Sequence, residues 1–233
     1  VFFSGCVLRC VFCQNSRISR ENFGKAVTVE RLREIFEDLV AQGAHNINLV
    51  SPTPYAPAIR EALEEPLPVP VVWNTGGYER VETLRSLEGK VQIWLPDLKY
   101  ADSGLAARYS GAADYFPAAT AAIEEMVRQT GDYVLEGGLL RRGVVIRHLL
   151  LPGALENAKA VMDWVAERFR PGQVLFSLMS QYIPWGRAGE FPELNRRLRP
   201  SEARSARQYM AALGLEGFVQ EDASAQSAFI PAF

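Results

Sequence analysis

Cysteine is scarce in this chain of 233 residues, and its only three copies, Cys6, Cys10 and Cys13, lie within eight positions of one another. An odd number of cysteines argues against the disulfide framework of a secreted protein. Free cysteine also packs as a small buried hydrophobic residue, but three independent core residues would rarely gather in one short segment. We therefore expect a reducing, cytoplasmic compartment and one chemical role shared by the three thiols.

The chain also lacks an excess of charge of one sign and any long apolar run. Its 25 Lys and Arg residues are balanced by 27 Asp and Glu residues, for a net charge of −2. This balance gives no bulk attraction to nucleic acid or to a membrane surface, and no apolar run approaches the ~20 residues that span a bilayer. The apolar residues 1–8 are too few for a signal peptide and have no basic flank. Because there is no initial Met, we expect the natural protein to continue upstream of Val1.

The chain does contain a regular alternation of two hydrophobic patterns. Residues 28–42 place Leu32 and Phe36 on one face of a helix that begins after Thr28, an N-cap residue, and ends before Gly43. Short β-branched and aromatic runs between such segments predict strands. We expect strands over 1–5, 46–51, 68–74, 91–96, 144–151 and 174–180, and helices over 28–42, 55–65, 78–87, 112–130, 154–169 and 200–214.

This alternation indicates an α/β fold. Six β–α repeats with continuous apolar strands predict a parallel sheet covered by helices, with right-handed crossovers. Six units are too few to close an eight-stranded barrel. A doubly wound sheet that binds a dinucleotide would carry Gly-x-Gly-x-x-Gly after a strand, and this sequence has none. We expect one domain over residues 1–233, an open, partial (β/α)6 barrel with its site at the carboxyl ends of the strands.

Side chains able to do chemistry follow most of the predicted strands. Turns alone would need only Gly, Pro, Asn and Ser. The residues at these positions are Cys6, Cys10 and Cys13, Ser51-Pro52-Thr53-Pro54, Asn74-Thr75-Gly76-Gly77, Asp97-Leu98-Lys99, Arg147 and Ser180-Gln181-Tyr182. Thiols, hydroxyls, amides, a carboxylate and two cations are therefore expected to meet at one edge of the sheet.

The cysteine spacing leaves two metal hypotheses open. Three residues separate Cys6 from Cys10, and two separate Cys10 from Cys13. A structural zinc ion needs four ligands, and the fourth would be His45 or His148. A [4Fe–4S] cluster also usually takes four thiolates, so three leave one iron open to a small molecule. The chain is then either an enzyme that uses the open iron, or a non-catalytic zinc or iron–sulfur electron-transfer module.

The motif Cys6-x3-Cys10-x2-Cys13, with Phe12 before the last cysteine, resembles the signature of the radical S-adenosylmethionine (SAM) superfamily. More narrowly, the chain resembles the pyruvate formate-lyase activating enzyme group and its poorly characterised relatives. The segments that resemble this group are GCVLRCVFCQN, WNTGGYERV, LPDLKYAD, VVIRHLLLPG and the run around SLMSQYIP. The resemblance implies a partial barrel of the radical SAM type.

The resemblance also implies a chemistry. Cys6, Cys10 and Cys13 would hold a [4Fe–4S] cluster whose fourth iron binds SAM. One electron, from a reductant such as flavodoxin or ferredoxin, would cleave SAM to a 5′-deoxyadenosyl radical, which takes hydrogen from a protein or peptide substrate. Activation of a glycyl-radical enzyme is one such reaction. Neither a nucleic acid nor a membrane is an expected partner.

Other residues are assigned by the same resemblance. Asp97 and Lys99 match an Asp-x-Lys beside SAM, and Arg147 matches an Arg in the family's Ile-Arg-x-x-x-x-Pro-Gly strand. An uncompensated charge in a buried strand is costly, so an anionic partner for Arg147 is reasonable. Phe12 would pack by the adenine or belong to the core. His148 would point to the opposite face from Arg147 and be structural.

Three positions depart from the family pattern. The usual Gly-Gly-Glu after the second strand is replaced by residues 51–54, so Thr53 would offer a hydroxyl to SAM instead. Asn74 stands in place of an Asp, and we keep it as a cofactor-binding candidate. Tyr182 stands in place of a His. These departures leave a third hypothesis, an inactive scaffold, whose one support is the altered segment.

The long loop over residues 181–199 is the last candidate region. Tyr182, Trp185 and Arg187 lie on it. They would contact the substrate, or the loop would simply be packed by its own aromatic residues.

Overall fold

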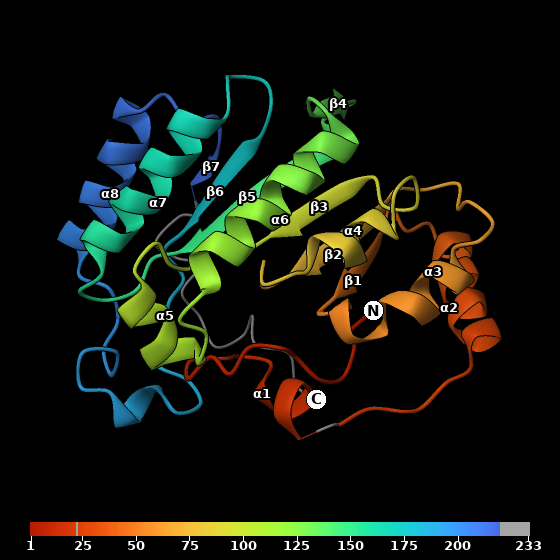
Figure 1. Cartoon of the computed structure of the whole chain (residues 1–233), viewed down its shortest axis with the longest axis horizontal. Coiled ribbons are helices and arrows are strands. Elements are labelled where there is room, and N and C mark those ends of the chain that lie inside the picture. Colours follow the sequence, from red (N-terminus) through yellow and green to blue (C-terminus); the bar gives the residue numbers. More distant parts are fainter. Residues whose placement is uncertain (22, 220–233) are drawn as a thin grey trace.

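The computed structural model describes residues 1–21 and 23–219, and its centre is a parallel β-sheet (Figure 1). The strands, in their order across the sheet, are β1 (Ile47–Val50), β2 (Val71–Thr75), β3 (Ile93–Pro96), β5 (Leu139–Leu149), β6 (Leu175–Met179) and β7 (Gly217–Val219). All neighbours in this order are parallel, and β4 (Val134–Glu136) pairs antiparallel with β5. The α/β prediction of an open, partial barrel is confirmed.

Helices connect successive strands. They are α1 (Ser16–Arg20), α2 (Val29–Ala41), α3 (Ala56–Ala62), α4 (Val81–Arg85), α5 (Ser103–Ser110), α6 (Tyr115–Thr130), α7 (Leu155–Arg168) and α8 (Pro200–Ala212), with short 3-10 turns η1 (Thr53–Tyr55) and η2 (Ala188–Glu190). Figure 1 shows α7 and α8 beside β6 and β7, and α2 and α3 beside β1. None of the helices in the described part of the chain is long and apolar enough to cross a membrane.

Local chemistry sets the helix ends. The side chain of Thr28 accepts a hydrogen bond from Arg31 N–H at 3.2 Å, so it caps α2 as predicted. Asp102 caps α5 in the same way, through Leu105 N–H at 2.8 Å. Gly111 ends α5 in the left-handed conformation, with φ of 70°. The predicted helix over 112–130 is therefore preceded by a second helix that the hydrophobic pattern does not reveal.

Three strand predictions need correction. The predicted strand over 1–5 is reduced to one bridge, Phe2 with Val50. β5 begins earlier than the predicted 144–151, because Gly137 and Gly138 turn the chain into a hairpin with β4. Both glycines have positive φ, at 58° and 80°, which a two-residue hairpin turn favours. β7 lies beyond the last predicted strand and extends the sheet past β6.

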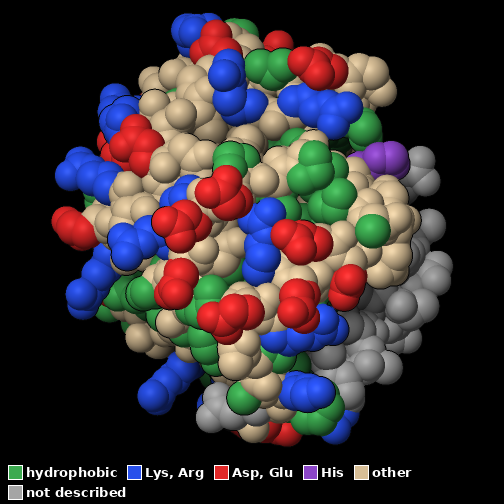
Figure 2. Space-filling view, turned by 90° about the vertical axis from the view of Figure 1, so that its right-hand side faces the viewer, with side chains coloured by type: hydrophobic (Ala, Val, Ile, Leu, Met, Phe, Trp, Pro, Cys, Tyr) green, Lys and Arg blue, Asp and Glu red, His purple; other side chains and the backbone are tan. Residues whose placement is uncertain are grey.

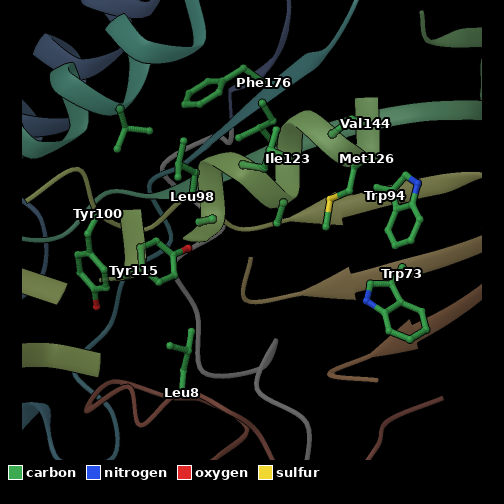
Figure 3. Close-up of a cluster of buried hydrophobic side chains, with 14 of the residues drawn as sticks. Leu8, Trp73, Trp94, Leu98, Tyr100, Tyr115, Ile123, Met126, Val144 and Phe176 are labelled. Carbon is green, nitrogen blue, oxygen red and sulfur yellow. The ribbon is translucent and has the colours of Figure 1, made fainter. Parts of the chain in front are cut away.

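The core fixes the middle of the sheet. Trp73 on β2 and Trp94 on β3 are fully buried, and their rings meet edge to face at 6.1 Å (Figure 3). Tyr100 and Tyr115 pack together at 5.5 Å. Replacing a buried residue of this size with Ala costs about 3–5 kcal/mol. The strand ends beside these residues are therefore held rigidly.

The surface over α2 and α3 mixes charges of both signs, as Figure 2 shows. On α2, Arg31 pairs with Glu34 at 2.8 Å and Arg33 pairs with Glu37 at 2.6 Å. Exposed pairs of this kind contribute about 0–1 kcal/mol each. This face therefore shows no region dominated by one sign of charge.

Candidate active site

A cavity of about 380 Å³ opens at the carboxyl ends of the strands, where the site is expected. It is closed on one side by residues 6–13, here called the cysteine loop. The residues that line it are Phe2, Cys6, Leu8, Cys10, Phe12, Cys13, Gln14, Asn15, Asn48, Val50, Ser51, Asn74, Thr75, Gly76, Asp97, Lys99, Arg147, Leu149, Met179, Gln181, Tyr182 and Ile183. Its volume lies in the range of small-molecule sites, ~300–1,000 Å³.

The cysteine loop is irregular but anchored. Arg9 N–H donates to Ser110 O at 3.0 Å, and Val11 N–H donates to Tyr109 O at 2.8 Å. Arg187 N–H in turn donates to Val11 O at 2.7 Å. The end of α5 and the loop over 181–199 therefore hold the middle of the cysteine loop from two sides.

Two of the three thiols, those of Cys10 and Cys13, have hydroxyl partners. Ser110 Oγ donates to Cys10 Sγ at 3.0 Å, and Ser110 Oγ lies 2.8 Å from the Tyr100 hydroxyl. Cys13 Sγ lies 3.5 Å from Ser19 Oγ. Burial raises the pKa of the Cys10 thiol, although the charge of Lys99 acts in the opposite direction. A bound iron would favour the thiolate and reverse this balance.

The charged cluster, defined as Asn74, Asp97, Lys99 and Arg147, faces the thiols across the cavity. Lys99 Nζ lies 2.5 Å from Asp97 Oδ2, and Arg147 Nη2 lies 2.7 Å from Asp97 Oδ1. Arg147 Nη2 also donates to Asn74 Oδ1 at 2.7 Å. Burial raises the pKa of Asp97, but Arg147 and Lys99 outweigh it and the net shift is downward. Asp97 is therefore ionised between two cations.

The backbone of this region is clamped by Tyr115, the first residue of α6. Its hydroxyl lies 2.8 Å from Gly76 O and 2.7 Å from Asp97 O, and it accepts a hydrogen bond from Lys99 N–H at 3.0 Å. Gly77 has φ of 83°, and a Cβ there would lie 2.1 Å from Asp97 O. Only glycine fits at this contact, which brings the end of β2 against the end of β3.

The predicted role of Thr53 differs from what the structure shows. Its hydroxyl donates to Glu79 Oε1 at 2.6 Å, and it does not line the cavity. Thr75 Oγ1 and Trp73 Nε1 donate to the same oxygen, at 2.6 and 3.2 Å. Burial raises the pKa of Glu79, against the effect of these donors. The buried carboxyl draws Thr53 inward and away from the cofactor side.

Ser51 takes the place expected of Thr53 at the cavity. It lines the cavity and adopts a left-handed backbone, with φ of 55°. A non-glycine residue in this region stores about 1–3 kcal/mol of strain, and such residues concentrate at functional sites.

Neither histidine serves as a fourth zinc ligand. His45 is exposed and precedes β1, at the opposite end from the cavity. His148 is buried, and its Nδ1 lies 2.7 Å from Leu98 O. Neither histidine lines the cavity with the three cysteines, so a zinc ion at the cysteine loop would have no histidine ligand among the described residues.

The aromatic candidates occupy two environments. Phe12 is buried at the cavity wall, and its ring meets Tyr182 edge to face at 6.0 Å. The Tyr182 hydroxyl donates to Leu194 O at 2.8 Å, so it fastens the loop over 181–199 internally. Trp185 is 39% exposed, and Arg187 pairs with Glu190 at 2.6 Å. The loop is packed by Tyr182, as one of the two hypotheses expects, and a substrate contact by Trp185 stays a prediction.

Several residues of the site escape sequence reasoning. Ser110 and Tyr115 lie about 100 positions from the cysteines and outside any motif, and Tyr100, although within LPDLKYAD, is given no role by that resemblance. The role of Glu79 cannot be predicted from the sequence, because the side chains that donate to it, Thr53 and Thr75, lie on two different segments. The run Gly76-Gly77 before Glu79 marks only the tight backbone contact.

The residues present fit an iron–sulfur cluster with SAM. Three half-buried thiols face one cavity, and within the described residues the hydroxyls of Ser110 and Ser19 reach two of them. Asp97 Oδ1 is buried and pairs with Arg147 Nη2, whereas Arg147 Nε is buried and makes no hydrogen bond within the described residues. A ligand with an ammonium and a carboxylate group matches these two side chains.

Comparison with known proteins gives the same assignment. The model of the radical SAM superfamily matches residues 1–165. A protein of Methanocaldococcus jannaschii, uncharacterized protein MJ0674, is 30% identical over 218 residues, which cover 88% of this chain and 60% of that protein. The chain thus spans less than two thirds of the length of this relative.

Two solved structures share the fold. SuiB of Streptococcus suis, bound to S-adenosylmethionine, has a TM-score of 0.62 and 14% identity, covering 94% of this chain and 49% of SuiB. A radical SAM methyltransferase of Sphaerobacter thermophilus has a TM-score of 0.62 and 16% identity, covering 94% of this chain and 64% of that chain. Because the family model covers more than half of the sequence, the chain belongs to the radical SAM superfamily, whose cofactors are a [4Fe–4S] cluster and SAM.

Proposed function

We propose that this chain is a radical SAM enzyme that takes a hydrogen atom from a protein or peptide substrate, with a glycyl-radical enzyme as the first candidate. The observation that supports it is one cavity with the three thiols on one side and the charged cluster on the other. Cys6, Cys10 and Cys13 would hold the cluster, which when bound and reduced would supply the electron for cleavage of the sulfonium S–C bond of SAM.

The chain's own residues would orient SAM. Arg147 and Lys99 offer positive charge to its carboxylate, and Asp97 offers an acceptor to its ammonium group. Asn74 holds Arg147 in place. Phe12 gives a buried aromatic surface for the adenine, and together with Tyr182 it keeps water from one side of the cavity.

The preference for a peptide or protein rests on exposed aromatic residues and on one protein of similar fold. Phe2 lines the cavity yet is 47% exposed, and elsewhere on the surface Trp185 and Tyr55 are also exposed. Exposed aromatic side chains favour an extended macromolecular contact. SuiB, similar in fold, is known in complex with its precursor peptide SuiA.

The test is anaerobic reconstitution with iron and sulfide, followed by reduction with dithionite in the presence of SAM. We expect a brown protein that forms 5′-deoxyadenosine. Deuterated candidate substrates then identify the partner, because the true one passes its label into 5′-deoxyadenosine. A colourless protein with one tightly bound zinc, or no SAM binding at millimolar concentration with the cluster present, would contradict the proposal.

A further inference from the structure

We propose that the cationic surface made by Arg9, Arg17, Arg20 and Lys25 is the docking site for an acidic protein that delivers one electron. This rests on the proposed function, since only a redox-active cluster needs such a donor. The electron balance is simple: the carrier loses one electron, the cluster gains it, and no atom is transferred. We call these four residues the cationic loop surface.

The charge is concentrated where the rest of the molecule is acidic. Residues 1–27 contain four Lys or Arg residues and one acidic residue, Glu21, for a net charge of +3. The whole chain carries −2, so the remainder carries −5. All four cationic side chains are exposed. An acidic partner would therefore be attracted to this segment, whereas the remainder of the chain gives it no net attraction.

These cations are not neutralised by the protein itself. No ion pair joins any of the four to a carboxylate within residues 1–21 and 23–219. Two other arginines near the cysteine loop differ, because Arg108 pairs with Glu193 at 2.7 Å and Arg187 pairs with Glu190 at 2.6 Å. The charge of the cationic loop surface thus remains available for a partner.

The surface lies directly against the thiols. Arg20 Nη2 donates to Cys10 O at 2.8 Å, and Ser19, its neighbour in α1, contacts Cys13 Sγ. Arg9 lies within the cysteine loop. Ser4 Oγ donates to Phe23 O at 2.8 Å, which places residues 23–25 against the start of this loop. Two residues of α1, Ser19 and Arg20, therefore link this surface to Cys13 and Cys10.

The composition also suits an interface. Phe23 is 46% exposed, and the Arg17 guanidinium lies 4.1 Å from the centre of its ring. Val7, in the cysteine loop, is 51% exposed. Arg and aromatic residues are enriched at protein interfaces, and apolar residues among cations favour a protein surface over a nucleic acid backbone.

The experiment compares two double charge reversals of the reconstituted protein. Arg17→Glu/Lys25→Glu changes the cationic loop surface and leaves Arg20, which contacts Cys10, in place. Arg60→Glu/Arg204→Glu is the control, since both residues are exposed, lie on α3 and α8, and make no ion pair within the described residues. The two variants change the net charge equally.

The probe is a purified acidic flavodoxin in its reduced form. Its binding is measured by fluorescence anisotropy, and reduction of the cluster by stopped-flow absorbance, at low and at high salt. For Arg17→Glu/Lys25→Glu we expect binding and the second-order reduction rate to fall about tenfold or more at low salt, with a smaller loss at high salt. The control should stay within about twofold.

Reduction by dithionite distinguishes a failure of the proposed docking site from a failure of the proposed function. It needs no docking site, so dithionite-driven SAM cleavage should be the same in both variants and in the unmodified protein. If no protein cleaves SAM with dithionite, the proposed function fails. If dithionite works but both variants lose flavodoxin binding equally, or if only RNA or anionic vesicles distinguish them, the docking proposal is overturned.

Discussion

The two sides of the cavity are held by different means. The cysteine loop contains no regular helix or strand, and its middle is fixed by three backbone hydrogen bonds to distant segments. The charged cluster lies on or next to the ends of β2, β3 and β5. Below it, Tyr115 joins two strand ends and His148 bonds to Leu98 O.

Because of this difference, we expect the cysteine loop to govern assembly of the iron–sulfur cluster and the charged cluster to govern the orientation of SAM. The cysteine loop has few contacts of its own, so a bound cluster adds much to its order. The charged cluster is set by the core, with fully buried aromatics behind it, and is therefore arranged before any ligand arrives. Substitutions on the first side should affect iron retention, and those on the second should affect SAM binding or folding stability.

The largest expected effect comes from removing a thiol. Cys10→Ala should leave too few ligands for the cluster, so iron content and SAM cleavage both fall to background. The protein without cluster should still fold, since the sheet is untouched. Iron analysis, visible absorbance and 5′-deoxyadenosine formation measure the first result, and circular dichroism measures the second. A Cys10→Ala protein that keeps iron and turnover would reject the ligand assignment.

The next effect concerns His148, beneath the charged cluster. Burial lowers the pKa of His148 to about 4, from an ordinary value of 6.5. Above pH 6.5 the imidazole is neutral in both states and has no effect on the pH dependence. As the pH falls toward 4, the unfolded chain takes up a proton that the folded chain does not, so stability decreases. Between pH 7 and pH 4.5 this loss should be about 2–3 kcal/mol.

His148→Asn isolates this contribution. The asparagine amide nitrogen takes the position of Nδ1 and can donate to Leu98 O, but it does not titrate, so the variant should lose about 2–3 kcal/mol less than the unmodified chain over the same pH interval. Urea unfolding of both cluster-free proteins at pH 7 and pH 4.5 gives the loss of unfolding free energy for each. Equal losses would show that His148 is not the group responsible.

More of the fold than of the candidate site could be predicted from the sequence. Apolar strands and amphipathic helices are local patterns, so the segments around β2, β3 and β6 are predicted to within a few residues. The hairpin of β4 and β5 was missed although Gly137-Gly138 is a turn signal, because its strands are partly exposed and lack a continuous apolar run. β7 is three exposed residues and leaves no hydrophobic pattern.

For the site, proximity at strand ends could be predicted but side-chain direction could not. The chain brings Asn74, Asp97, Lys99 and Arg147 to one cavity, as their strand-end positions indicate. Thr53 also follows the end of a strand, yet a buried carboxyl on another segment, Glu79, accepts a hydrogen bond from its hydroxyl. Such choices depend on contacts between distant residues, which a single sequence does not show.

A smaller effect is expected from Lys99→Met, which keeps the length of the side chain and removes its charge. SAM affinity should fall about 10–100-fold while the cluster is retained, because one cation facing the SAM carboxylate is lost. Lys159→Met is a matched control: Lys159 pairs with Glu156 at 2.8 Å on the surface of α7. Equilibrium dialysis with labelled SAM measures both. Unchanged affinity in Lys99→Met would remove Lys99 from the SAM site.

The smallest effect is expected at Ser110, which supports a thiol without binding the cluster itself. Ser110→Ala removes the hydrogen bond to Cys10 Sγ, so iron should be lost to a chelator about tenfold faster, and the cluster should become harder to reduce. SAM affinity should stay unchanged, because the charged cluster is intact. Tyr100→Phe is the control, since it removes the hydroxyl next to Ser110 but leaves the bond to sulfur.

Chelator kinetics and a redox titration followed by visible absorbance separate these variants. If Tyr100→Phe and Ser110→Ala lose iron equally fast, the effect comes from packing around α5 and not from the bond to sulfur. If only Ser110→Ala changes, and its reduction potential becomes more negative, the hydrogen bond tunes the cluster directly. The second result would show that a single contact in the cysteine loop tunes the cluster, in contrast to the charged cluster, whose strand ends are joined by Tyr115 and by backbone hydrogen bonds.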